Sequence, residues 1–321
     1  MIKWYSYVPI DTMYFKGSEP MEMGQNHTAS FIFPPPPETI IGAIRSLFLK
    51  QHQVDINEYR QGKSKNYIYK MIGKPSERPP FKLIGPIFKI ANEIYIPAPY
   101  IWYYEKEGDR DFFTDKETNV PFTEKLRIIK PDRVKSFLFK TKTNWLLWVK
   151  AGKYVETLGG KWVKVEENMF HKDILTFKDI RAFCTVETRV GIAIDANKKV
   201  VREGHIYSVN HVRLNKNVEL VFGIDGEIEL EDEGVMMLGG ERRFGRYQMI
   251  EEVNIPNGGT NMFSSLGITE VNDLTNKILI ATGKLNYIGG WDLNRGFHKP
   301  MKSFFPAGTI FYERLYNCVE I

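Results

Sequence analysis

IKWYSYVPI (residues 2–10) and PPETIIGAIRSLFLKQH (residues 36–52) together decide how the chain begins. The first stretch is aromatic and β-branched, which predicts a strand. The second opens with prolines, which the first turn of a helix tolerates. It continues with apolar residues at helical spacing from Ile40 to Phe48. A strand, a polar loop and a helix in this order indicate a βαβ-type unit.

The second half of the chain alternates β-forming residues with turn residues. TVETRVGIAID (185–195), GHIYSVNHVRL (204–214) and VELVFGI (218–224) follow one another, which predicts an antiparallel meander. The most basic part of the chain precedes them, because residues 120–165 contain eleven basic and three acidic residues. A solvated insertion with outward lysines is one interpretation of that bias, and the role of the segment stays open.

Length and composition limit the class of protein. The 321 residues suffice for two domains, which we place at 1–172 and 173–321. The net charge of +5 is too small to indicate a nucleic-acid-binding protein by itself. Cys184 and Cys318 form no C-x-x-C pair, which excludes a zinc ribbon and a disulfide framework. No apolar stretch is long enough to span a membrane, so we expect a cytoplasmic protein.

Motifs of common nucleotide and metal enzymes are missing from the sequence. The Gly-Gly-Lys step at 159–161 is followed by Trp162, where a P-loop has a hydroxyl residue. His205 and His211 share a face of a predicted strand, but ordinary surface or core histidines explain them better than a metal site. We therefore expect no metal, no cofactor and no catalytic constellation.

The most informative stretch is MMLGGERRFGRY (236–247). Gly239 and Gly240 have no Cβ to hold off an approaching backbone, and successive N–H groups at such a turn can bind an anion. Planar cations that suit phosphate follow at Arg242, Arg243 and Arg246. Phe244 and Tyr247 offer ring faces for base stacking. The alternative is a β-hairpin with a glycine turn and solvated arginines, and local composition does not separate the two.

A second cluster, LNYIGGWDLNRGFHKPMKSFFPAGTIFY (285–312), also contains a Gly-Gly step. Trp291 and Asp292 follow that step, and Lys299 lies farther along. One interpretation is a loop packed by Trp291, with Asp292 capping a turn. The other interpretation is that this cluster and the 236–247 stretch form two walls of one RNA-binding groove.

Several blocks of the sequence resemble a known family. They are DTMYFKGSEP (11–20), PPPPETIIGAIRSLF (34–48), ETRVGIAID (187–195), EGHIYSVNHVR (203–213), LGGERRFGRY (238–247), GGWDL (289–293), KPMK (299–302) and FPAGTIFY (305–312). In these blocks the chain resembles the third subunit of the Cmr effector complex, the type III-B CRISPR ribonucleoprotein of antiviral defence, within the RAMP superfamily. The glycine-rich loop marks only the superfamily, whereas its combination with the GGWD and PAG blocks is much more specific. Residues 49–177 carry no such motif.

The resemblance implies an α+β fold of two ferredoxin-like (RRM-like) RAMP domains, with insertions in the N-terminal half. It also implies a non-catalytic scaffold that holds the 5′ handle of the guide RNA. The implied protein partners are the large polymerase-like subunit and the first backbone RAMP subunit. The residues that it assigns to RNA contact are Arg45, Gly239, Gly240, Arg242, Arg243 and Arg246, and it places the loop around His27 near the RNA. Lys299 of the second cluster is a further predicted RNA contact. The resemblance assigns Trp291 and Asp292 to scaffolding of the groove.

Two other functions are compatible with the sequence. One is a RAMP endoribonuclease that processes guide RNA precursors without a metal, for which His27 is the candidate proton carrier. His27 is explained more simply as a polar loop residue. The other is a β-rich adaptor that binds proteins and no RNA.

Overall fold

The computed structural model describes residues 2–17, 28–29, 31–75, 77–106, 123–135, 145–152, 154–194, 201–274, 279–292 and 297–321. These residues are mostly strand with a few short helices, as expected for an α+β protein. They form two compact units. Unit 1 comprises Met1–Pro86, Cys184–Glu252 and Tyr287–Ser303, and unit 2 comprises Ile87–Phe183, Val253–Asn286 and Phe304–Ile321.

This grouping differs from the predicted division at residues 172 and 173. The reason is the pairing of strands that are distant in sequence. β1 (Ile2–Pro9) lies between β14 (Val218–Asp225) and β16 (Phe244–Ile250), and it is antiparallel to both. The predicted N-terminal strand is therefore the centre of a sheet whose neighbouring strands come from the second half of the chain.

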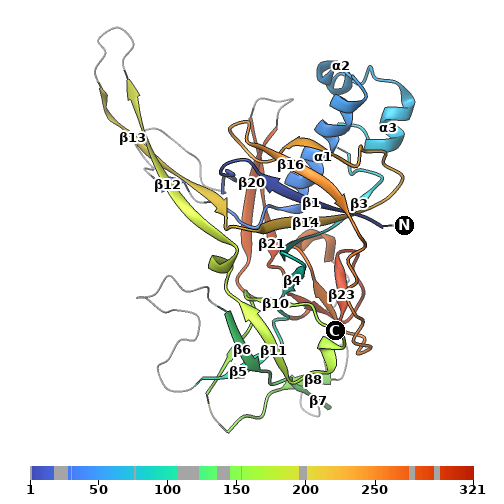
Figure 1. Ribbon diagram of the computed structural model, residues 1–321, viewed down its shortest axis with the longest axis vertical. Helices are drawn as coiled ribbons and strands as arrows, with labels where there is room; N and C mark the ends of the chain where they lie inside the picture. Colours follow the sequence, from blue (N-terminus) through green and yellow to red (C-terminus); the bar gives the residue numbers. More distant parts are fainter. Residues whose placement is uncertain are drawn as a thin grey trace. The chain divides into compact units, whose positions relative to one another are not determined.

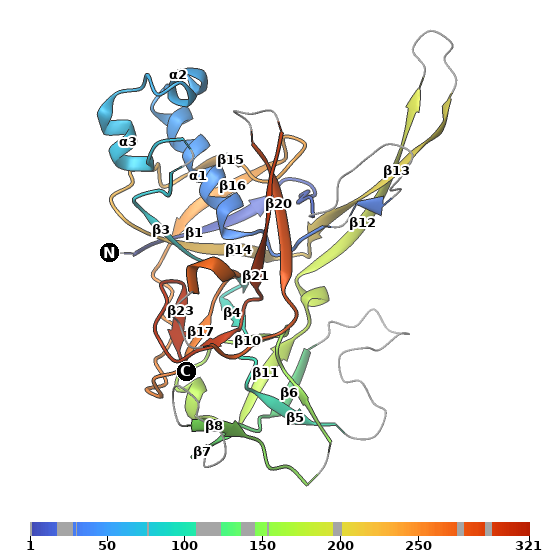
Figure 2. The same ribbon diagram turned by 180° about the vertical axis from the view of Figure 1, so that it is seen from behind.

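In unit 1 the strands of the sheet have the order β15-β16-β1-β14-β3 (Figure 2). β15 (Glu233–Met237) forms a hairpin with β16, and β3 (Lys82–Ile90) ends in unit 2. The predicted first helix is confirmed as α1 (Pro37–Gln51), which begins at a proline and buries Ile40, Ile44 and Phe48. Two further helices follow it, α2 (Ile56–Arg60) and α3 (Asn66–Ile72).

A long two-stranded ribbon also belongs to unit 1 (Figures 1 and 2). β12 (Cys184–Ile194) pairs antiparallel with β13 (Val201–Leu214), and β2 (Thr28–Ala29) joins β13 in parallel. The three predicted strands are thus confirmed, but the meander is wrong for the third strand, which does not join this ribbon. β14 instead pairs with β1, because its apolar residues complete the buried sheet.

The sheet of unit 2 has the order β3-β4-β10-β11-β6. Its core is aromatic: Phe183 stacks on Phe88 with ring centroids 4.4 Å apart and packs edge-on against Trp162. The described parts of the basic segment 120–165 contribute β6 (Thr123–Arg127) and β10 (Trp162–Lys164) to this sheet. That segment is therefore built into the fold of unit 2 at both ends.

The remaining strands are mostly short, apart from β20 and β21. They are β4 (Glu93–Pro97), β5 (Tyr103–Glu105), β7 (Asp132–Lys135), β8 (Trp145–Trp148), β9 (Val155–Thr157), β11 (Ile174–Lys178), β17 (Phe263–Ser265), β18 (Thr269–Glu270), β19 (Leu279–Ala281), β20 (Asn286–Asp292), β21 (Phe297–Phe305), β22 (Ile310–Phe311) and β23 (Cys318–Glu320). The 3₁₀ turns are η1 (Met169–His171), η2 (Ile180–Ala182) and η3 (Val271–Leu274). Among the described residues, no helix is long and apolar enough to cross a membrane.

Candidate nucleic-acid interface

The glycine-rich loop, residues 238–243, connects β15 to β16. The hairpin closes at the pair Met237 and Phe244, and within the loop the amide of Leu238 donates to the carbonyl of Arg243 at 3.0 Å. Glu241 and Arg242 both have left-handed backbones, with φ of 54° and 53°. The hairpin that local composition left as an alternative is therefore present, and it brings the predicted arginines to one end of the sheet.

The two glycines let this loop press against the chain that follows β1. A Cβ on Gly239 would lie 2.6 Å from the carbonyl oxygen of Tyr14, and φ at Gly239 is +91°. The amide of Gly240 donates to that same oxygen at 2.8 Å. The approaching backbone is therefore the protein's own, and the Gly240 N–H group is already in use instead of facing an anion.

Arg243 is not a free cation. Its Nη1 atom lies 3.1 Å from Oδ2 of Asp11, and its Nη2 atom lies 3.1 Å from Oε2 of Glu241. Its Nε atom is buried and has no hydrogen-bond partner among the described residues. By contrast, Arg242 and Arg246 are exposed, and neither forms an ion pair with the described part of the chain. The hairpin thus presents two available arginines, Arg242 in the loop and Arg246 on β16, and uses Arg243 internally.

Arg243 belongs to a larger cluster, which we call the Asp11 network. Its members are Asp11, Glu187, Arg189, Arg213, Glu241 and Arg243. Three carboxylates balance three guanidiniums, so the formal charge of the network is zero. It ties the end of β1, the β12–β13 ribbon and the glycine-rich loop together.

Electrostatics inside the Asp11 network favour the ionised carboxylates. The hydrogen bond from Arg213, at 2.8 Å, lowers the pKa of Asp11 to about 2. Arg213 also donates to Glu187, which lowers the pKa of that carboxyl and raises the pKa of the guanidinium. Since all the charges are mutually satisfied, this cluster holds the loop in place and has little capacity left for a ligand.

His211 is a core residue. Its ring stacks on Tyr14 with centroids 5.3 Å apart, and Nδ1 lies 3.1 Å from Oγ1 of Thr12. Burial lowers the pKa of the imidazole. The interpretation of His211 as an ordinary core histidine agrees with this geometry. Among the described residues, no group of three or more His, Cys, Asp or Glu side chains could hold a metal.

The two aromatic residues of the hairpin differ in solvent exposure. Phe244 is 48% exposed, whereas Tyr247 is 2% exposed and its hydroxyl accepts a hydrogen bond from Gln51 at 2.6 Å. The prediction that Tyr247 offers a ring face to RNA is therefore wrong, because strand alternation turns it toward α1. Phe244 remains open to solvent.

Arg45 is turned into the protein. Its Nη2 atom donates to the carbonyl oxygen of Glu77 at 2.6 Å, and burial lowers the pKa of the guanidinium. Gly73 lies against it, since a Cβ there would be 3.0 Å from Nη2. Arg45 is therefore engaged within its own helical region, and its contact with RNA stays a prediction.

The other predicted residues are placed only in part. Lys299 is exposed on β21, and its side chain lies over Gly290 of β20. The backbones of Trp291 and Asp292 end β20, but their side chains lie outside what the structure describes. His27 also lies outside the described residues.

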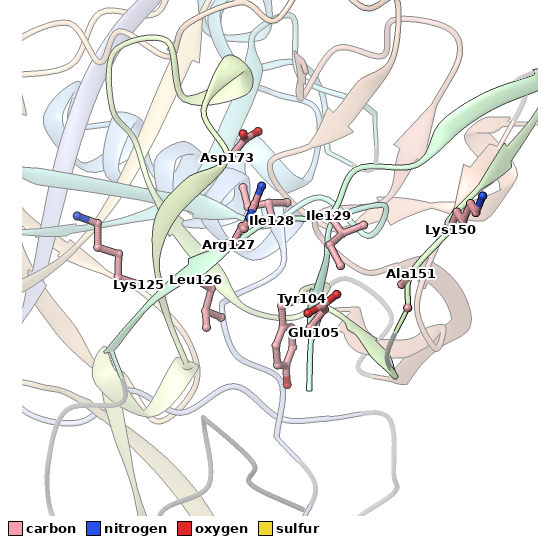
Figure 3. A pocket seen from close by; sticks show the side chains of 11 residues that line it. Tyr104, Glu105, Lys125, Leu126, Arg127, Ile128, Ile129, Lys150, Ala151 and Asp173 are labelled. Atoms are coloured by element: carbon pink, nitrogen blue, oxygen red, sulfur yellow. The ribbon is translucent and has the colours of Figure 1, made fainter. Parts of the chain in front are cut away.

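Unit 2 contains a separate cavity of about 500 Å³ (Figure 3). Lys125, Arg127 and Lys150 line it together with Glu105 and Asp173, so its charge is mixed. None of the residues predicted from the sequence to bind RNA lines this cavity.

Sequence reasoning did not identify the partners of Arg243. Asp11 follows β1, whereas Arg189 and Arg213 lie on β12 and β13, and only the pairing of β12 with β13 and the fold of unit 1 bring the three together.

Comparison with known proteins gives the family. The model of the family described as CRISPR-associated protein (Cas_Cmr3) matches residues 5–263. A search of curated proteins finds no match. A chain of the "Cryo-EM structure of the Type III-B Cmr-beta bound to cognate target RNA and AMPPnP, state 1" is similar with a TM-score of 0.52 and 15% identity, over 96% of this chain and 85% of that chain.

A chain of the "Cryo-EM structure of the Type III-B Cmr-beta bound to cognate target RNA" gives a TM-score of 0.51 and 15% identity, over 96% of this chain and 86% of that chain. At this identity the likeness shows a shared fold. The family match covers most of the chain, from the central strand of unit 1 to β17. The chain therefore belongs to the CRISPR-associated protein (Cas_Cmr3) family.

Proposed function

We propose that this chain is a non-catalytic scaffold subunit of a type III-B CRISPR effector complex and that it binds the 5′ handle of the guide RNA at the glycine-rich loop. The observation that carries the proposal is the exposure of Arg242 and Arg246 beside an anchored loop. Permanently charged, unpaired guanidiniums on a preorganised backbone suit phosphate. The family membership supports the assignment.

The proposal includes two protein partners, the large polymerase-like subunit and the first backbone RAMP subunit. It also includes two ferredoxin-like domains and a cytoplasmic location. The two structures with a similar fold are described as Type III-B Cmr-beta bound to target RNA, which supports a role in such an assembly.

Replacement of both free arginines tests the RNA site. Each phosphate contact with single-stranded RNA contributes about 0.7 to the magnitude of the slope of log affinity against log salt concentration. The slope of the R242A/R246A variant should therefore be smaller in magnitude by about 1.4. Binding of labelled single-stranded RNA carrying the repeat-derived handle, measured with the full chain at several salt concentrations, gives both slopes. The control is K63A/K70A, which removes two exposed cations of the α2–α3 region of unit 1, outside the hairpin. An unchanged slope in the arginine variant would refute this site.

The proposal that the chain does not cleave RNA has a separate test. Repeat RNA incubated with the full chain in a chelating buffer should stay intact. Sequence-specific cleavage that disappears in the H27A variant would instead support the endoribonuclease that the sequence also allows, because His27 is its candidate proton carrier.

A further inference from the structure

The two faces of the unit 1 sheet differ near the glycine-rich loop. Tyr7 and Tyr247 are opposite each other in register and are buried on one face, where Gln51 of α1 reaches Tyr247. Successive strand residues point to opposite faces, so Val8 and Arg246 belong to the other face. That second face is open, since Val8 is 43% exposed and Arg246 is exposed.

The open face carries two rows of side chains across three strands. We call these residues the open strip: Val8, Ile10, Val235, Met237, Phe244 and Arg246. Phe244 is paired with Met237 of β15, and the Ile10 amide on its other side donates to its carbonyl at 3.2 Å. In the next row Arg246 stands between Val8 and Val235. An aromatic ring and a guanidinium are therefore the centres of two apolar rows.

The charge of the open strip indicates which kind of molecule binds there. Any molecule that lies on this face removes the Arg246 guanidinium from water, which is costly unless that molecule supplies an anion. Arg242 adds a second cation at the adjoining loop. Neither Arg242 nor Arg246 forms an ion pair with the described part of the chain. A ligand with regularly spaced anions satisfies both arginines, whereas a single carboxylate of a protein satisfies one.

Phe244 supplies the second half of the recognition. It lies two residues before Arg246 on the same face of β16, so their Cα atoms are roughly 6.7 Å apart. Single-stranded RNA is bound elsewhere by sheets whose exposed aromatic rings stack on bases. We infer that the open strip binds single-stranded RNA, with one base stacked on Phe244 and backbone phosphates at Arg246 and Arg242. This inference rests on the proposed function and adds a sheet surface and a stacking residue to it.

Substitution of Phe244 separates stacking from charge. A stacked base is worth about 1–3 kcal/mol, so F244A should weaken binding of the single-stranded handle RNA by roughly 5- to 150-fold. The salt slope should stay as in the wild type, because no charge is removed. F244W should retain wild-type affinity. Y154A is the matched control, since Tyr154 is a 73% exposed aromatic residue of unit 2.

Ultraviolet crosslinking of the wild-type full chain to the same RNA should modify the peptide that contains Phe244. One outcome would refute base stacking on Phe244 and still support the RNA site at the arginines. In that outcome F244A binds with wild-type affinity, no crosslink forms at Phe244, and R242A/R246A has a smaller salt slope. Unchanged RNA binding together with failure of F244A to enter the assembled effector complex would show a protein on this face and also overturn the inference. Absence of RNA binding by the wild type would overturn the proposed function itself.

Discussion

Nη1 of Arg243 lies 3.1 Å from Oδ2 of Asp11, a residue 232 positions earlier in the sequence. Asp11 follows the central strand of unit 1, and Arg243 ends the glycine-rich loop. The ion pair therefore fastens the loop to the sheet. Because Arg243 is held there, it positions its neighbours Arg242 and Phe244 and leaves them exposed.

Asp11→Asn should loosen the glycine-rich loop. The substitution removes the charge that Arg213 and Arg243 both face, while it keeps the size of the side chain. We expect faster hydrogen exchange in a peptide covering 238–245, where the amide of Gly240 bonds to Tyr14. Exchange followed by mass spectrometry measures this, with Asp225→Asn as the control in the same unit. Equal exchange in the two variants would show that the ion pair does not hold the loop.

Acid should open the loop only at very low pH. Hydrogen bonding to Arg213 lowers the pKa of Asp11 from its ordinary 3.8 to about 2. A carboxyl with a lowered folded-state pKa stabilises the fold above its unfolded pKa, and the contribution disappears as the pH falls through the folded value. The contribution of Asp11 should therefore be complete above pH ~4 and be lost between pH ~4 and ~2. Titration of the Asp11 carboxyl carbon by NMR checks this, and a midpoint near 4 would contradict it.

The sequence was most informative where the pattern is local. Helical spacing and the leading proline predicted α1, and aromatic and β-branched content predicted β1. Alternation of β-forming and turn residues predicted β12 and β13. The division into two units was not predictable, because it depends on β1 pairing with β14 and β16 from the other half of the chain. Local propensity carries no information on which distant strands pair.

The candidate site shows the same limit. Composition marked Arg242, Arg243 and Arg246 as equivalent cations, but their availability depends on where Asp11 lies in the fold. Phe244 and Tyr247 were likewise equivalent as aromatic residues. Their odd spacing of three places them on opposite faces once the segment is a strand, and only the position of α1 decides which face is covered.

Gly239→Ala should destabilise the protein more than a glycine substitution in open space. A Cβ at Gly239 meets the Tyr14 carbonyl oxygen at 2.6 Å and also requires an L-residue at φ +91°. Gly62→Ala is the matched control in unit 1, since Gly62 has φ +75° but a Cβ there meets nothing within 4 Å. The backbone strain costs about 1–2 kcal/mol in both variants, so any further loss at Gly239 reports the clash. Urea denaturation compares them, and equal losses would show that the loop simply moves away from Tyr14.

Arg45 distinguishes a structural arginine from one that binds RNA. Its guanidinium donates to the Glu77 carbonyl and lies against Gly73, so Arg45→Ala should lower the free energy of unfolding by roughly 1–3 kcal/mol. If that is its role, the folded variant should bind handle RNA with the wild-type salt slope. A phosphate contact at Arg45, as the family resemblance implies, predicts the reverse: little change in urea denaturation and a slope smaller by about 0.7. Measurement of both quantities on one variant decides between the two roles, with Lys63→Ala as the control for removal of an exposed cation.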